Sequence, residues 1–189
     1  FTTCPVVPDQ TASWKTYTNS EYGFEFKYPV AAALTEKNET ETWFGGTDQI
    51  IIKNIATIST PSAEQRDAFI IFYVATGNNA VNNCYKQNLN GQAPEITKTQ
   101  EINGTVFHVV SFDDSAMGGK RDNVTQYSLL KNNTCYFIQG NNTYSDIQFI
   151  HGATDGKPAT QQELDEQASK IKAGQDFINS IISTFKFTK

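Results

Sequence analysis

The segment 17–29 constrains the fold most, because aromatic residues alternate along it with glycine or charged residues. The aromatic positions are Tyr22, Phe24, Phe26 and Tyr28. A period of two is typical of a strand with one buried face. A shorter alternation at Trp14, Thr16 and Thr18 precedes it, and Asn19–Glu21 supplies turn residues between the two. The chain therefore begins with a predicted hairpin that ends at Pro29, since proline cannot donate to a β-ladder.

Further strands are predicted along the rest of the chain. The continuous apolar run 69–74 indicates a central strand, and Asn103-Gly104 between alternating residues is a strong signal for a two-residue hairpin turn. The other predicted strands are 50–58, 126–131, 135–139 and 185–187. Three polar or mixed stretches predict irregular structure, namely 30–49, 113–123 and 140–158.

Two helices are predicted. Apolar residues near helical spacing favour a short helix over 80–90, followed by Gly91. Thr160 and Glu163 form a capping box at the start of a longer helix. The apolar stripe of this helix comprises Leu164, Ala168, Ile171, Ile178, Ile181 and Phe185. Many antiparallel strands with few helices indicate an α+β domain whose helices pack on the faces of the sheet.

Length and charge limit the class of protein. The 189 residues suffice for one domain, which we place at 14–189, and residues 1–13 are expected to form a flexible tether. The net charge of −5 and the scattered basic residues argue against nucleic acid as a partner. No apolar run is long enough to predict a transmembrane segment.

The three cysteines lie too far apart in sequence for a zinc motif. Cys84 and Cys135 both fall in predicted ordered segments, and we expect them to form a disulfide; the alternative is two buried free thiols. Cys4 lies in the tether and is open to three interpretations: a free thiol, an intermolecular bridge or the lipidated residue of a lipoprotein. Five Asn-x-Thr sequons would mark surface positions in a glycosylating pathway. They begin at Asn38, Asn103, Asn123, Asn132 and Asn141.

Three blocks together resemble the PsbP-like family. They are 17–29 with its Tyr-Gly-Phe-x-Phe-x-Tyr-Pro core, the block Ile102–Phe107, and Ile182–Phe187 after an amphipathic helix. The resemblance covers 14–187 and is carried by structural motifs. It implies a PsbP-like α/β/α sandwich in a small secreted protein or lipoprotein of a bacterium, located outside the cytoplasm. The chain departs from the family after Pro29, where Val30 and three alanines replace the usual Gly-Trp.

Candidate sites for chemistry are few. Asp113, Asp114 and Asp122 could bind a hard cation such as calcium through the predicted 113–123 loop, although Lys120 and Arg121 could instead neutralise them. The aromatic residues of irregular segments could contact a ligand or cap the core; they are Trp43, Phe44, Tyr144 and Phe149.

A catalytic site has little support. His108 shares one face of a predicted strand with Val106 and Val110, and His151 lies in a predicted irregular segment. Cys84 paired with a histidine could act as a nucleophile, but the disulfide competes with that interpretation.

We therefore expect no enzyme and no cofactor. The expected function is a binding or assembly module at the cell envelope with a protein partner. The alternatives are a protein that binds a small molecule or divalent cation, and a hydrolase with an unrecognised site.

Overall fold

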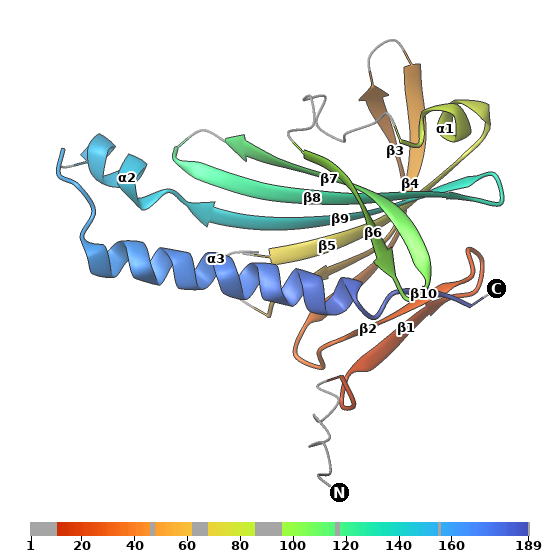
Figure 1. Ribbon diagram of the computed structural model, residues 1–189, viewed down its shortest axis with the longest axis horizontal. Coiled ribbons are helices and arrows are strands. Elements are labelled where there is room, and N and C mark those ends of the chain that lie inside the picture. The colour runs from red at the N-terminus through yellow and green to blue at the C-terminus, as the bar shows by residue number, and fades with distance from the viewer. Residues whose placement is uncertain are drawn as a thin grey trace, which may run out of the picture.

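The chain folds into two antiparallel sheets and three helices, as shown by a computed structural model that describes residues 11–45, 48–61, 68–85, 96–115, 118–154 and 156–188 (Figure 1). The smaller sheet has the order β1-β2-β10, and its strands are β1 (Lys15–Asn19), β2 (Phe24–Tyr28) and β10 (Lys186–Phe187). The predicted opening hairpin and final strand are thereby confirmed.

The larger sheet has seven strands in the order β3-β4-β5-β9-β8-β7-β6. These strands are β3 (Ala33–Gly45), β4 (Asp48–Ser59), β5 (Ala68–Thr76), β6 (Ile96–Ile102), β7 (Thr105–Ser115), β8 (Lys120–Lys131) and β9 (Thr134–Ser145). The central position predicted for the apolar run 69–74 is confirmed, because β5 lies between β4 and β9. The predicted Asn-Gly turn joins β6 to β7, with φ of 48° at Asn103 and 78° at Gly104.

Helices lie on both faces of the seven-stranded sheet (Figure 1). The long helix α3 (Gln161–Ile182) runs along one face, the short helix α1 (Asn78–Asn83) packs near β4 and β5 on the other, and α2 (Ile147–Thr154) lies at the end of the sheet. The predicted α+β class, with helices on the faces of an antiparallel sheet, is confirmed. No helix in the described part of the chain has the length and apolar content needed to span a membrane.

Aromatic side chains join the two sheets and α3 into one core. Phe26 stacks on Phe72 of β5 with ring centroids 4.1 Å apart, and Phe24 stacks on Phe185 at 5.4 Å. All four side chains are buried. The aromatic face predicted for the first hairpin is therefore covered by β5 and by the residues that follow α3.

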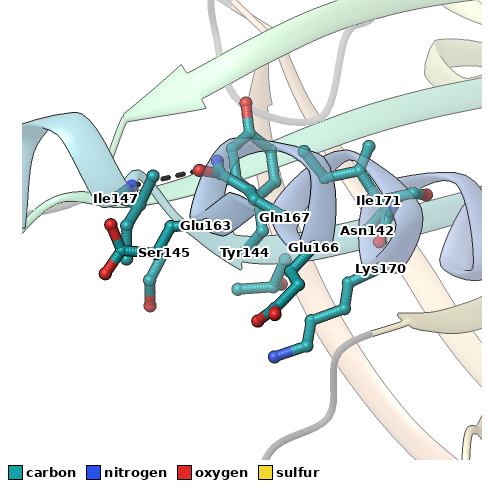
Figure 2. Close-up of a pocket in the computed structure, with 10 residues that line it drawn as sticks. Asn142, Tyr144, Ser145, Ile147, Glu163, Glu166, Gln167, Lys170 and Ile171 are labelled. Carbon is teal, nitrogen blue, oxygen red and sulfur yellow. Dashed lines mark hydrogen bonds between the residues drawn. The ribbon is translucent and has the colours of Figure 1, made fainter. Parts of the chain in front are cut away.

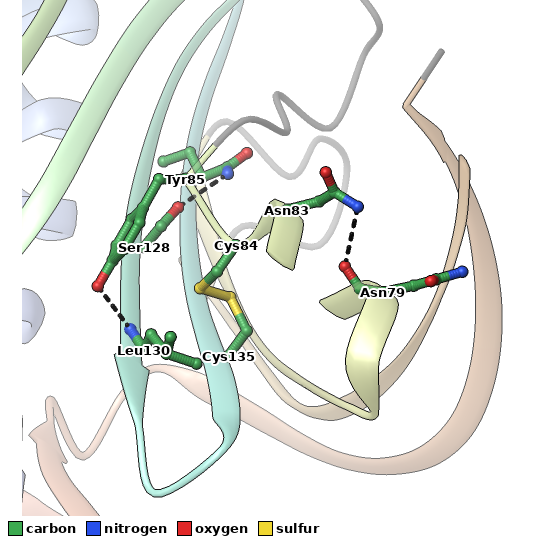
Figure 3. Close-up of a disulfide and its surroundings, with 8 residues drawn as sticks. Asn79, Asn83, Cys84, Tyr85, Ser128, Leu130 and Cys135 are labelled. Carbon is green, nitrogen blue, oxygen red and sulfur yellow. Dashed lines mark hydrogen bonds between the residues drawn. A yellow bond between two sulfur atoms is a disulfide. The ribbon is translucent and has the colours of Figure 1, made fainter. Parts of the chain in front are cut away.

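The predicted disulfide is formed between Cys84, just after α1, and Cys135 on β9 (Figure 3). Both cysteines are fully buried in a second cluster that includes Ile52, Tyr73 and Phe137. The bridge spans 51 residues and fixes α1 to the face of the sheet opposite α3. The interpretation of Cys84 as a nucleophile is wrong, because a bridged cysteine has no thiolate.

Three predicted irregular stretches contain regular structure, and those predictions are wrong. Strand β3 occupies most of 30–49, yet its described side chains at 33–42 are exposed or half-buried, so no apolar alternation marks it. The 113–123 stretch is shorter than predicted, since β7 continues to Ser115 and β8 begins at Lys120. Hydrogen bonds to neighbouring strands stabilise these strand segments although their sequence is polar.

The third stretch, 140–158, contains the end of β9 and all of α2. Gly140 and the two asparagines after it have low strand propensity, which hides the strand from a propensity argument. Gly140 lies directly under Ile178 of α3, and a Cβ at this position would stand 2.5 Å from the Ile178 Cγ2 atom. The glycine is therefore needed for close packing of α3 on β9. The predicted helix 80–90 is also shorter, as α1 ends at Asn83; residues 86–90 lie outside the described residues.

Candidate functional site

A cleft of about 450 Å³ lies between the first half of α3 and the last residues of β9 (Figure 2). Its two long walls are Asn142–Ser145 of β9 and one face of α3, and Ile147 of α2 closes one end. The α3 residues in the wall are Glu163, Glu166, Gln167, Lys170 and Ile171. Their spacing of three and four places them on one side of the helix.

This wall of α3 continues the stripe that the second half of the helix buries. Toward the C-terminus the stripe consists of Gly174, Ile178, Ile181 and Ile182, all buried. Toward the N-terminus it becomes polar, and Ala168 of the predicted apolar stripe is exposed. Polar residues on the side of a helix that faces a sheet are unfavourable unless they have a function. The change in polarity therefore marks the cleft as a candidate functional site.

The inner end of the cleft is closed by Asn142. Its Nδ2 atom donates a 2.7 Å hydrogen bond to the backbone carbonyl of Ile171. Gly174, one helical turn on, lies against the same asparagine, and a Cβ there would overlap the Asn142 Oδ1 atom. Helix α3 thus packs closely on β9 where the cleft ends.

The outer end is closed by α2, which contacts α3 at two points. The backbone N–H of Ile147 donates to Gln167 Oε1 at 3.2 Å, and His151 Nε2 lies 3.2 Å from Glu163 Oε1. Asp146 caps α2 by accepting hydrogen bonds from the N–H groups of residues 148 and 149, and its second oxygen pairs with Arg121 at 3.3 Å. These contacts make α2 a fixed wall of the cleft.

The negative charge of Glu163, in the wall of the cleft, is stabilised by its neighbours. The backbone N–H and hydroxyl of Thr160 and the His151 ring hold the pKa of the Glu163 carboxyl below its usual value, because each favours the ionised form. Burial, aided by the charge of Asp113, raises the pKa of the Tyr144 phenol, which therefore stays neutral. Figure 2 shows Glu166 and Lys170 side by side at the mouth of the cleft, where both are exposed. The mouth thus carries one charge of each sign.

Of the two aromatic residues in this predicted set whose side chains the structure describes, Tyr144 lines the cleft and Phe149 does not. Phe149 is exposed and packs over Gly119, and a Cβ at Gly119 would stand 2.5 Å from Phe149 Cδ1. The φ of 78° at Gly119 independently favours glycine. The side chains of Trp43 and Phe44 lie outside the described residues. The remaining cleft residues were missed because the sequence shows only a polar helix face, whose partner strand was predicted to be irregular.

The three aspartates predicted to bind a cation lie on adjacent strands. Asp114 of β7 stands directly opposite Asp122 of β8, whereas Asp113 pairs with Asn123 and so occupies the other face of the sheet from Asp122. The Asp122 Oδ1 atom is buried without a hydrogen-bond partner. Among the described residues, no three His, Cys, Asp or Glu side chains cluster in a way that could hold a metal ion. Cation binding by Asp113, Asp114 and Asp122 stays a prediction.

The two histidines lie apart from each other in the fold. His108 lies on β7 with its ring centroid 4.9 Å from that of Tyr85, and His151 contacts Glu163. Cys84 is bridged to Cys135. Each of these three residues, which were considered as catalytic candidates, therefore makes a structural contact.

The five sequons differ in accessibility. Asn38 and Asn132 are exposed, whereas Asn141 is buried. Asn103 is exposed as a residue, but its Nδ2 atom donates to the carbonyls of Ser183 and Phe185, each at 2.8 Å. Asn103 and Asn132 both adopt positive φ in hairpin turns, which is a backbone reason for asparagine at these two positions. Cys4 lies outside the described residues, so its lipidation stays a prediction.

The fold and the cleft define an α+β domain that has helices on both faces of its antiparallel sheet and a candidate site at one end of its long helix. No family model matches the chain, and no curated protein matches it. Among solved structures the chain is similar to cyanobacterial PsbP (CyanoP) from Synechocystis sp. PCC 6803, with 10% identity, a TM-score of 0.47 and 98% of each chain covered. It is also similar to a crystal structure from Bacteroides thetaiotaomicron VPI-5482, with 10% identity and a TM-score of 0.43, over 93% of this chain and 48% of that one. The first of these structures is named for the family that the sequence motifs resemble.

Proposed function

We propose that the protein is a non-enzymatic binding module that works outside the cytoplasm, on or near the cell envelope, and that it holds a protein partner in the cleft between α3 and β9. The observation that carries the proposal is the polar half of the α3 stripe. Four polar side chains of α3 line a bounded cleft, with Glu163 and Gln167 half-buried and Glu166 and Lys170 exposed at its mouth.

The walls of the cleft support binding because they are fixed before any partner arrives. Asn142 is tied to the α3 backbone, Ile147 to Gln167, and His151 to Glu163. A preformed site loses little conformational entropy on binding. Its mixture of Tyr144, Ile171 and several amide or hydroxyl groups suits a partner that offers both apolar and hydrogen-bonding surface.

The location outside the cytoplasm is supported by the Cys84–Cys135 disulfide, since such bridges persist in oxidising compartments. The non-enzymatic role is supported by the structural contacts of His108, His151 and Cys84.

Site-specific photo-crosslinking tests the proposal. A benzoylphenylalanine placed at position 170, at the mouth of the cleft, should crosslink an envelope protein of the cells that make this protein. The matched control is position 172, which is exposed on the same helix outside the cleft and whose lysine pairs with Asp176. A product at 170 and none at 172 supports the proposal; equal products, or none at 170, contradict it.

A second candidate function is the binding of a divalent cation at Asp122, one of the three aspartates predicted for such a site. The orphaned Oδ1 atom of Asp122 favours it, because a buried carboxylate oxygen without a partner costs free energy that a cation would offset.

A further inference from the structure

We infer that a second pocket, between the β1–β2 hairpin and the strands β3 and β4, binds a free α-amino acid as its zwitterion. The described lining of this pocket comes from β1, the turn after it, β3 and β4, so the pocket is separate from the α3–β9 cleft. Its volume is about 250 Å³. Pockets for drug-sized ligands measure roughly 300–1,000 Å³, so this one suits a smaller molecule. The inference goes beyond the proposed function.

A β-bulge shapes one wall of this pocket. Between Glu36 and Glu39 the register shifts, so that Lys37 and Asn38 of β3 stand opposite the single residue Ile55 of β4. Ile55 is itself an extra residue in the pairing of β4 with β5. A regular strand sends consecutive side chains to opposite faces, whereas a bulge re-aims one of them. Lys37 and Asn38 thus both line the pocket, together with the buried Ile55.

Another wall presents the phenol of Tyr17. The Tyr17 ring is buried and stacks on Phe26 with centroids 5.0 Å apart, and its hydroxyl accepts a 3.4 Å hydrogen bond from the Asn19 side chain. Burial raises the pKa of this phenol, the bond from Asn19 opposes the rise, and the charge of Glu36 adds to it. The Glu36 carboxylate therefore lies near a neutral phenol. Both groups have oxygen atoms that accept hydrogen bonds from a ligand ammonium group.

Two half-buried ammonium groups line the same pocket, those of Lys37 and Lys53. Lys53 Nζ lies 3.3 Å from Glu21 Oε1, and Lys37 Nζ lies 3.4 Å from Glu39 Oε2. The glutamate of each pair is exposed, and exposed ion pairs contribute little free energy. A ligand carboxylate can therefore share or replace either glutamate at small cost.

The balance of charge in the pocket indicates the class of ligand. The described lining holds two lysines and two glutamates, Glu21 and Glu36, so a simple anion or cation would meet like charges as well as opposite ones. A zwitterion matches both signs. In a free α-amino acid a single carbon separates the ammonium from the carboxylate, so both charges enter one small pocket. We assign the ammonium to Glu36 and Tyr17, and the carboxylate to Lys37 and Lys53.

An NMR titration tests the inference by following the backbone amides of the isotope-labelled protein while each standard amino acid is added separately. We expect at least one of them to shift the amides at 36–38 and 53–55 in a saturable way. The N-acetyl derivative of that amino acid lacks the ammonium, and its amide derivative lacks the carboxylate. Each derivative should bind roughly tenfold or more weakly than the free amino acid.

Variants of the protein assign the two charged groups. Glu36→Gln should weaken binding of the amino acid roughly tenfold but change little for its N-acetyl derivative, which has no ammonium to lose. Lys53→Gln should likewise weaken the amino acid but change little for its amide derivative. Glu101→Gln and Lys172→Gln, which are exposed and outside the pocket, are matched controls and should leave binding unchanged. Thermal melting checks that each variant is folded, and Lys37→Gln replaces Lys53→Gln if the latter is unfolded.

The opposite results are equally clear. The inference is overturned if no amino acid shifts these amides at millimolar concentration, or if the shifted amides lie elsewhere, such as at 142–147 in the α3–β9 cleft. It is also overturned if the N-acetyl derivative binds as tightly as the free amino acid, or if Glu36→Gln and Lys53→Gln both bind like the wild type. The crosslink at position 170 probes the other site, so its result is independent of this one.

Discussion

Asn142 packs directly against Gly174. Its side chain, which donates to the Ile171 carbonyl, lies where a Cβ at position 174 would be. Strand β9 and helix α3 approach each other there, and the cleft begins one helical turn away. The buried glycine therefore determines both the stability of the α3–β9 contact and the inner boundary of the site.

Gly174→Ala is expected to destabilise the protein by about 1–3 kcal/mol, since the new methyl group displaces Asn142 and breaks its hydrogen bond. In the background of Asn142→Ala, the same Gly174→Ala substitution should instead stabilise the protein. Alanine is favoured over glycine in a helix by about 1 kcal/mol, and the clash is then absent. Chemical denaturation of the four proteins of this double-mutant cycle measures both effects. A simple sum of the two single effects would mean that the residues are not coupled.

Asn103 connects the β6–β7 turn to the C-terminal end of the core through its two hydrogen bonds to the carbonyls of Ser183 and Phe185. Asn103→Gly preserves the positive φ of 48° but removes both bonds, so we expect a loss of about 1–3 kcal/mol. Asn132 supplies a matched control, because it has φ of 50° at the same kind of turn and is exposed. Asn132→Gly should change the free energy of unfolding by less than about 0.5 kcal/mol. Equal losses in the two variants would show that the turn conformation matters and the two bonds do not.

Gly104 has φ of 78°, which a β-branched residue adopts only with strain. Gly104→Val should therefore lower the melting temperature markedly, by several degrees. The space around Gly104 is open, so a steric clash would not account for the change. An unchanged melting temperature would mean that the β6–β7 hairpin is not formed as described.

Local sequence signals predicted the elements whose chemistry is local. The aromatic alternation of 22–28, the turn at Asn103-Gly104 and the capping box at Thr160 each depend on nearby residues, and all three are present. Strand β3 and the end of β9 depend instead on neighbouring strands, which no local pattern reveals. The cleft was missed for the same reason: its polar wall on α3 is significant only opposite β9, and that part of β9 was predicted to be irregular.

Glu163 links the start of α3 to the cleft wall, and its lowered pKa makes the link dependent on pH. A carboxyl whose folded-state pKa is depressed contributes stability in full above its unfolded pKa of about 4.3. The contribution is lost as the pH falls from there through the folded-state value. Glu163→Gln should therefore lower the melting temperature at pH 7, and the difference from the wild type should shrink below about pH 4.3. A difference that persists unchanged at pH 2 would mean that the charge of Glu163 is not responsible.

The Cys84–Cys135 bridge closes a segment with a sequence separation of 51, for which the chain-entropy relation gives about 4 kcal/mol of stabilisation. We expect a reductant, or Cys84→Ser with Cys135→Ser, to lower the melting temperature strongly, while Cys4→Ser has no effect. Alkylation under denaturing conditions without reductant should label at most Cys4. Labelling of all three cysteines in protein isolated from the cells that naturally make it would contradict both the bridge and the proposed location, because a chain that folds outside the cytoplasm meets the oxidising conditions that close such a bridge.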